Sequence, residues 1–258
     1  MVALLLACGG PASPPAELDH AHDPIVLTAL AAASLTDALP DVAEAWKTHG
    51  GGTATVTFSF DSSSKLVKQL EAGAPADLLF TADAETMSAA AVHGLLEADT
   101  RRDLLGNVLV VVVPADAIWT PASAAELANP SLDHLAVAGE NVPAGRYARS
   151  ALESAGVWTA VEPRIVRGDN VRTTLGWVTR GEADAGVVYA TDARSEPGVR
   201  VAFSFPPESH APIVYPAAVV SSAAHPAEAA AFLSFCASPD AKAIFANAGF
   251  TPPPSAGP

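Results

Sequence analysis

The sequence predicts an α/β fold, because β-rich stretches alternate with helical ones along the chain. Residues 108–113 (VLVVVV) form a continuous β-branched run, which is typical of a strand buried on both faces of a sheet. Residues 53–60 (TATVTFSF) are rich in β-formers, and the apolar residues of segment 65–70 then recur at helical spacing. Shorter strands are expected at residues 135–138, 161–166 and 185–188.

The first strand is expected to run from Thr28 through three alanines into Ser34, where a Ser-x-x-Asp pattern ending at Asp37 is typical of a helix start. The first N–H groups of a helix have no internal acceptor and lie at the positive end of its dipole. Such a junction can therefore bind an oxyanion, with the Ser34 hydroxyl as a further donor. An ordinary capping box is the alternative. Pro40 falls inside this helix and should kink or shorten its second turn.

A second junction of this kind follows residues 53–60. Asp61 and three consecutive serines lead into the helix at residues 65–70. One serine suffices for capping, so at least one other is free to face a ligand, although a solvated serine-rich turn is the alternative. Because like charges in a cleft repel, Asp61 must point away from a bound anion or be neutralised by Lys65.

The second half of the chain offers three further donors. Ala144 precedes a helix expected from Arg146 to Ser154, and Val171 opens another, so both present backbone N–H groups at helix starts. Tyr189 follows the strand at residues 185–188 and can aim its phenol at a cleft. Tight-turn chemistry around Ala144, and simple packing of Tyr189, are the alternatives.

Composition narrows the class of protein. The chain has 258 residues, half of them apolar, with 28 acidic against 14 basic residues and a net charge of −14. This balance argues against a nucleic-acid partner, and an anion would have to be held by short-range donors in a closed cleft. The signatures of nucleotide binding and of α/β-hydrolases are absent from the sequence, and its histidines are scattered rather than paired with a nucleophile.

Residues 1–8 resemble a signal peptide that ends in a bacterial lipobox, with Cys8 as the lipidated residue. Leu6 stands where a small residue is usual, and no lysine or arginine precedes Lys47. Residues 9–24 are rich in Gly, Pro, Ala and Ser and are expected to form a flexible tether. The two histidines and two aspartates at 19–23 are interpreted as solvated linker rather than as a metal site. Cys236 is expected in the core of a helix, without a disulfide.

Six motifs occur in the order seen in the periplasmic molybdate-binding proteins of ABC importers, which the chain resembles over residues 25–250. They are AAASLTDAL, FDSSSKLVKQLEAGAPADLLFTAD, LLGNVLVVVVP, VPAGRYARSAL, GDNVRTTLGWV and AGVVYATDA. The resemblance implies a type II periplasmic binding protein fold with a ligand cleft between two lobes. Residues 25–105 and 214–258 would form the first lobe, and residues 106–213 the second.

The same resemblance implies the site and the partners. A tetrahedral molybdate or tungstate ion would contact Ser34, Ser63, the N–H groups of Ala144 and Val171, and the Tyr189 hydroxyl, with no direct metal ligand and no cofactor. The implied protein is a monomer and not an enzyme. It would be periplasmic or held at the cell surface through Cys8, and it would deliver its ion to a membrane permease.

Two other functions are compatible with the sequence. The first is a receptor of the same fold for sulfate or another small oxyanion, although the AAAS and SSS motifs favour molybdate. The second is an effector-sensing domain or an enzyme on this fold. The missing helix-turn-helix segment and the lipobox-like start argue against the sensing domain, and the missing nucleophile–base pair argues against the enzyme.

Overall fold

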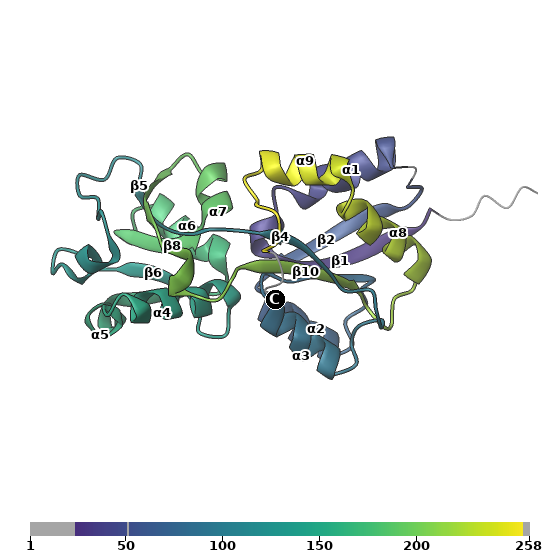
Figure 1. The fold of residues 1–258 in the computed structure, drawn as a ribbon, viewed down its shortest axis with the longest axis horizontal. Coiled ribbons are helices and arrows are strands. Elements are labelled where there is room, and N and C mark those ends of the chain that lie inside the picture. Colours follow the sequence, from purple (N-terminus) through teal and green to yellow (C-terminus); the bar gives the residue numbers. More distant parts are fainter. Residues whose placement is uncertain (1–23, 51, 255–258) are drawn as a thin grey trace, which may run out of the picture.

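The computed structural model describes residues 24–50 and 52–254, which fold into two α/β lobes joined by extended strands (Figure 1). Cys8 and residues 9–23 of the expected tether, with the histidine-containing segment at 19–23, lie outside the described residues. No helix in the described part of the chain is long and apolar enough to span a membrane.

The first lobe is built on a five-stranded sheet in the order β2-β1-β3-β10-β4. Strands β2 and β3 pair with β1 in parallel, whereas β10 runs antiparallel to β3 and β4. The strands are β1 (Val26–Ala32), β2 (Thr55–Asp61), β3 (Leu78–Phe80), β4 (Arg102–Gly106) and β10 (Val214–Val219). The helices are α1 (Leu39–His49), α2 (Ser63–Glu71), α3 (Ala84–Val92), α8 (Pro226–Cys236) and α9 (Pro239–Asn247).

Alternating side chains of β1 supply both faces of this sheet. Leu30 packs into a buried cluster with α2 and α3, while Ala29 and Ala31 belong to the core on the side of α1, α8 and α9. The helices accordingly cover opposite faces of the sheet (Figure 1). Small alanines on β1 let those helices approach closely. Cys236 is buried in α8 and carries a free thiol, which confirms its expected core position.

The second lobe holds another five-stranded sheet, in the order β7-β6-β8-β5-β9. Its strands are β5 (Leu109–Pro114), β6 (Leu135–Ala138), β7 (Ile165–Gly168), β8 (Ala185–Tyr189) and β9 (Val199–Ser204). Its helices are α4 (Pro143–Ser154), α5 (Trp158–Val161), α6 (Val171–Thr179) and α7 (Ala190–Ser195). Short 3-10 turns occupy Ala33–Leu35, Ala124–Ala128, Glu162–Arg164 and Pro207–Ser209.

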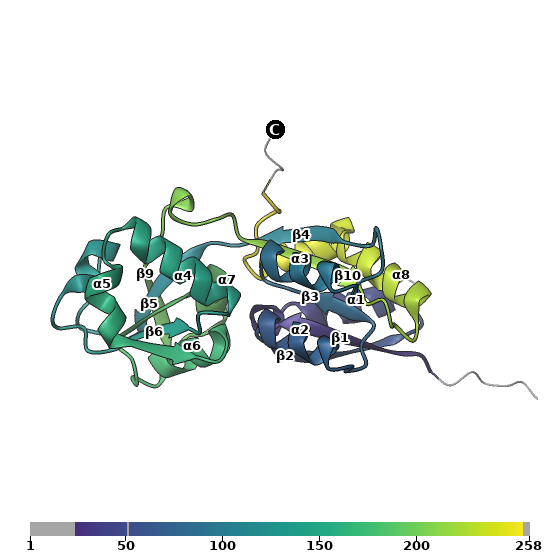
Figure 2. The same ribbon diagram turned by 90° about the horizontal axis from the view of Figure 1, so that it is seen from below.

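The chain passes between the lobes twice, from β4 to β5 and from β9 to β10 (Figure 2). A third segment joins these connections, because Gly106 and Thr251 exchange backbone hydrogen bonds of 2.7 and 3.1 Å. A β-carbon at Gly106 would lie 2.6 Å from the Thr251 hydroxyl and 2.7 Å from the Pro252 carbonyl oxygen. Glycine is therefore required where these segments touch.

Two expectations were wrong, and a proline explains each of them. Ser34 does not begin an α-helix: it lies in a 3-10 turn, and α1 begins only at Leu39, with Pro40 in its first turn. A proline lacks the N–H that would continue a helix from Ser34 but is well accommodated in a first turn, so the helix restarts there without a kink. The strand expected at 161–166 is shortened for a similar reason. Pro163 lies in a 3-10 turn, and pairing begins at Ile165.

Candidate functional site

A small cavity lies where the two lobes face each other. Its volume is about 10 Å³, so in this arrangement it suits an ion of a few atoms better than a sugar or an amino acid. It is lined by Ala32, Ala33, Ser34, Asp61, Ser62, Ser63, Ala82, Val142, Pro143, Ala144, Asn170, Val171 and Tyr189. A larger cavity of about 540 Å³ lies between β4, α9 and residues 250–253, but it contains none of the residues expected to bind a ligand.

All five residues predicted from the sequence line the small cavity. Ser34 and Ser63 come from the first lobe, and Ala144, Val171 and Tyr189 come from the second. The residues lie up to 155 positions apart in the chain, and the fold brings them together by closing one lobe over the other. A ligand in this cavity would therefore touch both lobes at once.

The serine triplet at the start of α2 is not used for capping. Ser62 is the residue before the helix, yet its side chain makes no capping hydrogen bond, and its hydroxyl is buried without a partner. The Ser63 hydroxyl oxygen accepts a hydrogen bond of 2.9 Å from the Ala82 N–H, which leaves its hydrogen free to donate. The structure thus places two donor hydroxyls at the cavity where the sequence suggested at least one.

Backbone donors come from the first turns of α4 and α6. Helix α4 begins at Pro143, three residues earlier than expected, so Ala144 lies in the first turn, where helix geometry provides its N–H with no acceptor. Val171 is the first residue of α6, and the side chain of Asn170 caps that helix by accepting a 3.0 Å bond from the Thr173 N–H. This cap leaves the Val171 N–H directed at the cavity end of the helix.

The α4 start approaches β6 so closely that only glycine fits at its third position. A β-carbon at Gly145 would lie 2.1 Å from the Gly139 carbonyl oxygen and 2.4 Å from that of Ala138. The glycine therefore sets how near the first turn of α4 comes to the end of the strand.

Tyr189 ends β8 and lines the cavity, and its hydroxyl is buried without a hydrogen-bond partner among the described residues. Burial raises the pKa of Tyr189 well above its ordinary value, so the phenol keeps its proton and acts as a donor at neutral pH. The ring is held edge-on by Tyr147 and Tyr215, with centroids 6.5 and 5.9 Å away.

Asp61 is the one acidic residue among those lining the cavity, and its carboxylate is engaged by neighbours. Its Oδ1 accepts bonds from the Ser62 N–H at 2.7 Å and from the Asn170 amide at 3.2 Å. Lys65 Nζ lies 3.9 Å from the same oxygen, which is the neutralisation expected from the sequence. No lysine or arginine is among the described residues that line the cavity.

Ion pairs tie the two lobes together around the site. Lys65 of α2 pairs with Asp169 of the second lobe at 3.2 Å. Arg146 of α4 pairs with Asp83 of the first lobe and donates to the Thr86 hydroxyl at 2.9 Å. These contacts hold the cleft in a closed arrangement.

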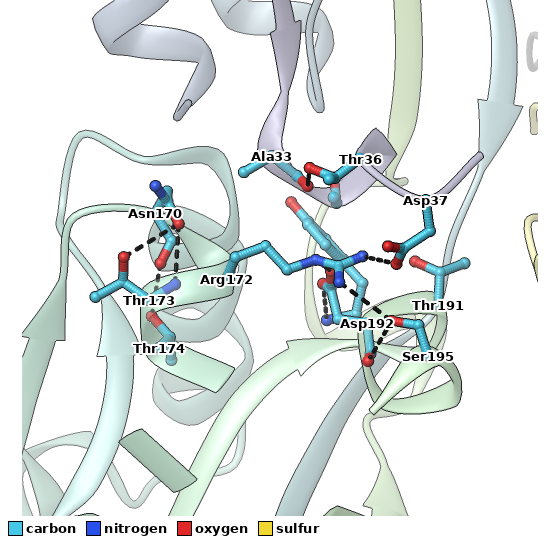
Figure 3. A network of polar contacts seen from close by, with 12 residues as sticks. Ala33, Thr36, Asp37, Asn170, Arg172, Thr173, Thr174, Thr191, Asp192 and Ser195 are labelled. Atoms are coloured by element: carbon cyan, nitrogen blue, oxygen red, sulfur yellow. Dashed lines mark hydrogen bonds and ion pairs between the residues drawn. The ribbon is translucent and has the colours of Figure 1, made fainter. Parts of the chain in front are cut away.

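Arg172 forms a further bridge, shown in Figure 3. Its guanidinium reaches Asp37 of the first lobe at 2.6 Å and the buried Asp192 of α7 at 2.8 Å. The contact between Arg172 Nε and Asp192 Oδ1 lacks the angle of a hydrogen bond, so it is an ion pair. Burial raises the pKa of Asp192 to about 6, against the opposing charge of Arg172.

Sequence reasoning missed Asn170 and Ser62, and it named Ser63 among the three serines through the family resemblance. The capping role of Asn170 could have been predicted, because asparagine before a helical segment is a typical N-cap. Its hydrogen bond to Asp61 spans 109 positions, so no local sequence pattern indicates it. The described residues contain no group of three or more His, Cys, Asp and Glu side chains arranged to hold a metal ion.

Comparison with known proteins agrees with this geometry. The sequence model of the bacterial extracellular solute-binding proteins matches residues 27–251. Molybdate-binding protein ModA of Escherichia coli (strain K12) is 41% identical over 230 residues, covering 87% of this chain and 88% of that protein. The Azotobacter vinelandii periplasmic molybdate-binding protein has a similar structure, with a TM-score of 0.79, 26% identity and coverage of 88% of this chain and 99% of that chain.

The sulfate-binding protein SubI from Mycobacterium tuberculosis H37Rv has a TM-score of 0.76 at 21% identity, covering 88% of this chain and 87% of that one, and shares the fold alone. The match over residues 27–251, the two-lobed fold and the small cavity between the lobes agree with one another. The chain belongs to the family of bacterial extracellular solute-binding proteins.

Proposed function

We propose that this protein binds molybdate between its lobes and presents it to the membrane permease of an ABC importer, with tungstate as an equivalent ligand. The observation that carries the proposal is the convergence of neutral donors from both lobes on one ion-sized cavity. The identity of 41% to the molybdate-binding protein of Escherichia coli supports the choice of ion.

Neutral donors are well suited to hold a dianion. Charge-assisted hydrogen bonds contribute about 1.5–3 kcal/mol each, and they require no buried lysine or arginine whose desolvation would offset the gain. The hydroxyls of Ser34, Ser63 and Tyr189 and the N–H groups of Ala144 and Val171 form the proposed donor set. Ser62 adds a sixth candidate, because its buried hydroxyl has no other partner.

The donor set favours anions that are fully deprotonated near neutral pH. A protonated anion such as hydrogen phosphate places an O–H against N–H and O–H donors, and the Asp61 carboxylate already accepts from Ser62 and Asn170. Serine hydroxyls can rotate to relieve part of this conflict. Discrimination against phosphate is therefore expected to be strong but incomplete.

Sulfate is the second candidate ligand, because it is also a tetrahedral dianion at neutral pH. It is smaller than molybdate, so donors fixed on rigid helix starts would have to stretch their bonds to reach it. Isothermal titration of the purified protein with molybdate, tungstate, sulfate and phosphate tests the proposal. Tight binding of the first two with weak or no binding of sulfate is expected, and equal affinities for sulfate and molybdate would overturn the choice of ion.

The family membership supports an extracytoplasmic location. We further propose that Cys8 carries a lipid anchor, that the protein works as a monomer and that it has no catalytic activity. Fatty-acid labelling in a bacterial host should label the parent protein and not the Cys8→Ser variant. The variant should bind the anion as tightly as the parent, because residues 9–24 separate the anchor from the lobes.

A further inference from the structure

Tyr215 on β10 places its hydroxyl behind the anion cavity rather than in it. The residue is buried, and its hydroxyl lies 3.0 Å from the Ser34 oxygen and 3.2 Å from the Asn107 amide nitrogen. Asn107 lies between β4 and β5, where the chain first passes from one lobe to the other. These three side chains form a continuous polar path from the connection between the lobes to the cavity wall.

The neighbours of Asn107 fix the direction of the hydrogen bonds. Its Oδ1 accepts from the Val108 N–H at 2.8 Å, which turns the amide nitrogen toward Tyr215 and toward the Thr191 hydroxyl 2.9 Å away. An amide nitrogen donates and cannot accept, so the Tyr215 oxygen must accept from Asn107. The single hydrogen of Tyr215 is then left for Ser34.

Ser34 becomes a donor as a consequence. Its oxygen accepts from Tyr215, so its own hydrogen remains available to the cavity that the residue lines. Hydrogen bonds in a chain polarise one another, and accepting from Tyr215 strengthens the donation by Ser34. Burial also raises the pKa of Tyr215 far above neutrality, so the hydrogen that sets this order is always present.

We propose that Asn107 and Tyr215 form a hydrogen-bond relay that orients the Ser34 hydroxyl toward the bound oxyanion, which makes both of them positioning residues for the site. The inference rests on the proposed function. It adds that anion affinity depends on two residues that do not line the cavity. The relay is also anchored in both lobes, because Tyr215 lies in the first lobe and Thr191 in the second.

Two substitutions test the relay by titration of the full chain with sodium molybdate. Tyr215→Phe removes the donor to Ser34 and should weaken binding by about two- to thirteenfold, the range expected for one net hydrogen bond. Asn107→Asp keeps the shape of the side chain but reverses the order. Tyr215 would then donate to the new carboxylate, and Ser34 would spend its hydrogen on Tyr215. A loss at least as large as that of Tyr215→Phe is expected.

Each variant is also measured in a Ser34→Ala background. With the serine hydroxyl gone, Tyr215→Phe should have no further effect, and Asn107→Asp should keep only the part of its loss that comes from repulsion between its added negative charge and the anion. Tyr147→Phe is the matched control, because its hydroxyl donates to the Pro212 carbonyl oxygen, at 3.4 Å, and takes no part in the path from Asn107 to Ser34. Thermal unfolding without molybdate shows whether each variant is folded, and the two variants give independent answers.

The outcomes separate the relay from the proposed function. No molybdate binding by the parent would overturn the proposed function itself. Normal binding by the parent, with losses for Tyr215→Phe and Asn107→Asp that are the same with and without the Ser34 hydroxyl, would overturn the relay alone. Unchanged affinity in both single variants would also overturn it.

Discussion

At the scale of the residue, the site depends on hydroxyl groups whose hydrogens have no acceptor within the described residues. The Ser63 oxygen is occupied as an acceptor by the Ala82 N–H, and the hydroxyls of Ser62 and Tyr189 are buried without partners. A buried donor left unsatisfied costs about 1–3 kcal/mol, so an acceptor placed among these groups recovers that free energy. This arrangement of donors thus favours an oxyanion.

The serine triplet allows a matched test at the residue scale. Ser63→Ala should weaken molybdate binding by about 1–3 kcal/mol, through one lost charge-assisted hydrogen bond, and Ser62→Ala should weaken it in the same direction. Ser64 does not line the cavity, so Ser64→Ala should bind as the parent does. Titration of the three variants with molybdate measures this. An equal loss in all three would mean that the substitutions act through the helix and not through the anion.

Asp192 predicts a pH dependence of stability. Because burial raises its pKa to about 6 in the folded protein, against an ordinary value of 3.8, the folded state holds this proton more tightly than the unfolded state does. The contribution of Asp192 to the free energy of unfolding should therefore rise as the pH falls from 6 toward 4, by up to about 3 kcal/mol, and stay level above 6.

Urea unfolding of the parent and of Asp192→Asn between pH 4 and 7 isolates this contribution. The parent should gain stability relative to the variant as the pH falls, because only the parent takes up the proton. Parallel curves for the two proteins would show that Asp192 is not the titrating group.

At the scale of the element, short helix starts supply the backbone donors. Val171 is the first residue of α6, and Asn170 before it has an extended backbone, with φ −153° and ψ 176°. Proline is favoured at the first position of a helix, and the residue before a proline must have an extended backbone. A proline at this position should remove the N–H and leave the helix intact.

Val171→Pro should therefore weaken molybdate binding by about ten- to a hundredfold, the range expected for one charge-assisted bond, without a large loss of thermal stability. Val171→Ala is its control, because it removes the packed side chain but keeps the N–H. Titration and thermal unfolding of both variants check the prediction. If alanine weakens binding as much as proline, the side chain matters and the backbone donor does not.

The elements also show how much of the structure could be predicted from the sequence. The β-branched run at 108–113 and the strands at 135–138 and 185–188 were predictable because their buried side chains are their own signal. The helix expected from Ser34 and the strand expected from residue 161 both begin later in the structure. Pro40 and Pro163 cause these shifts, and their effect depends on the turn in which each proline lies. The five site residues came from the resemblance. The bond between Ser34 and Tyr215 spans 181 positions, and only the fold reveals it.

At the scale of the whole molecule, the site exists only when the lobes are closed, since each lobe supplies part of the donor set. The pairs Lys65–Asp169 and Arg172–Asp37 cross the cleft and stabilise that closed state. Partly exposed ion pairs contribute about 0.2–1 kcal/mol, so closure is favoured by them but not fixed. The bound ion, which touches both lobes, would supply the rest.

Asp37→Asn should therefore weaken molybdate binding by about 1.5- to fivefold, and the loss should shrink at high salt. Glu182→Gln is the matched control, because it also removes one negative charge but breaks a 2.8 Å pair with Arg180 inside the second lobe. Titrations at low and high sodium chloride measure both variants. A loss in Glu182→Gln equal to that in Asp37→Asn would assign the effect to net charge rather than to closure.

The most direct measurement is a crystal structure of the protein with molybdate, with the ion located by its anomalous scattering. The account predicts one molybdenum peak between the lobes, with oxygens about 2.7–3.2 Å from the hydroxyls of Ser34, Ser63 and Tyr189 and from the N–H groups of Ala144 and Val171. A peak elsewhere in the molecule, or an ion held by lysine or arginine side chains, would contradict the claim that neutral donors from both lobes form the site.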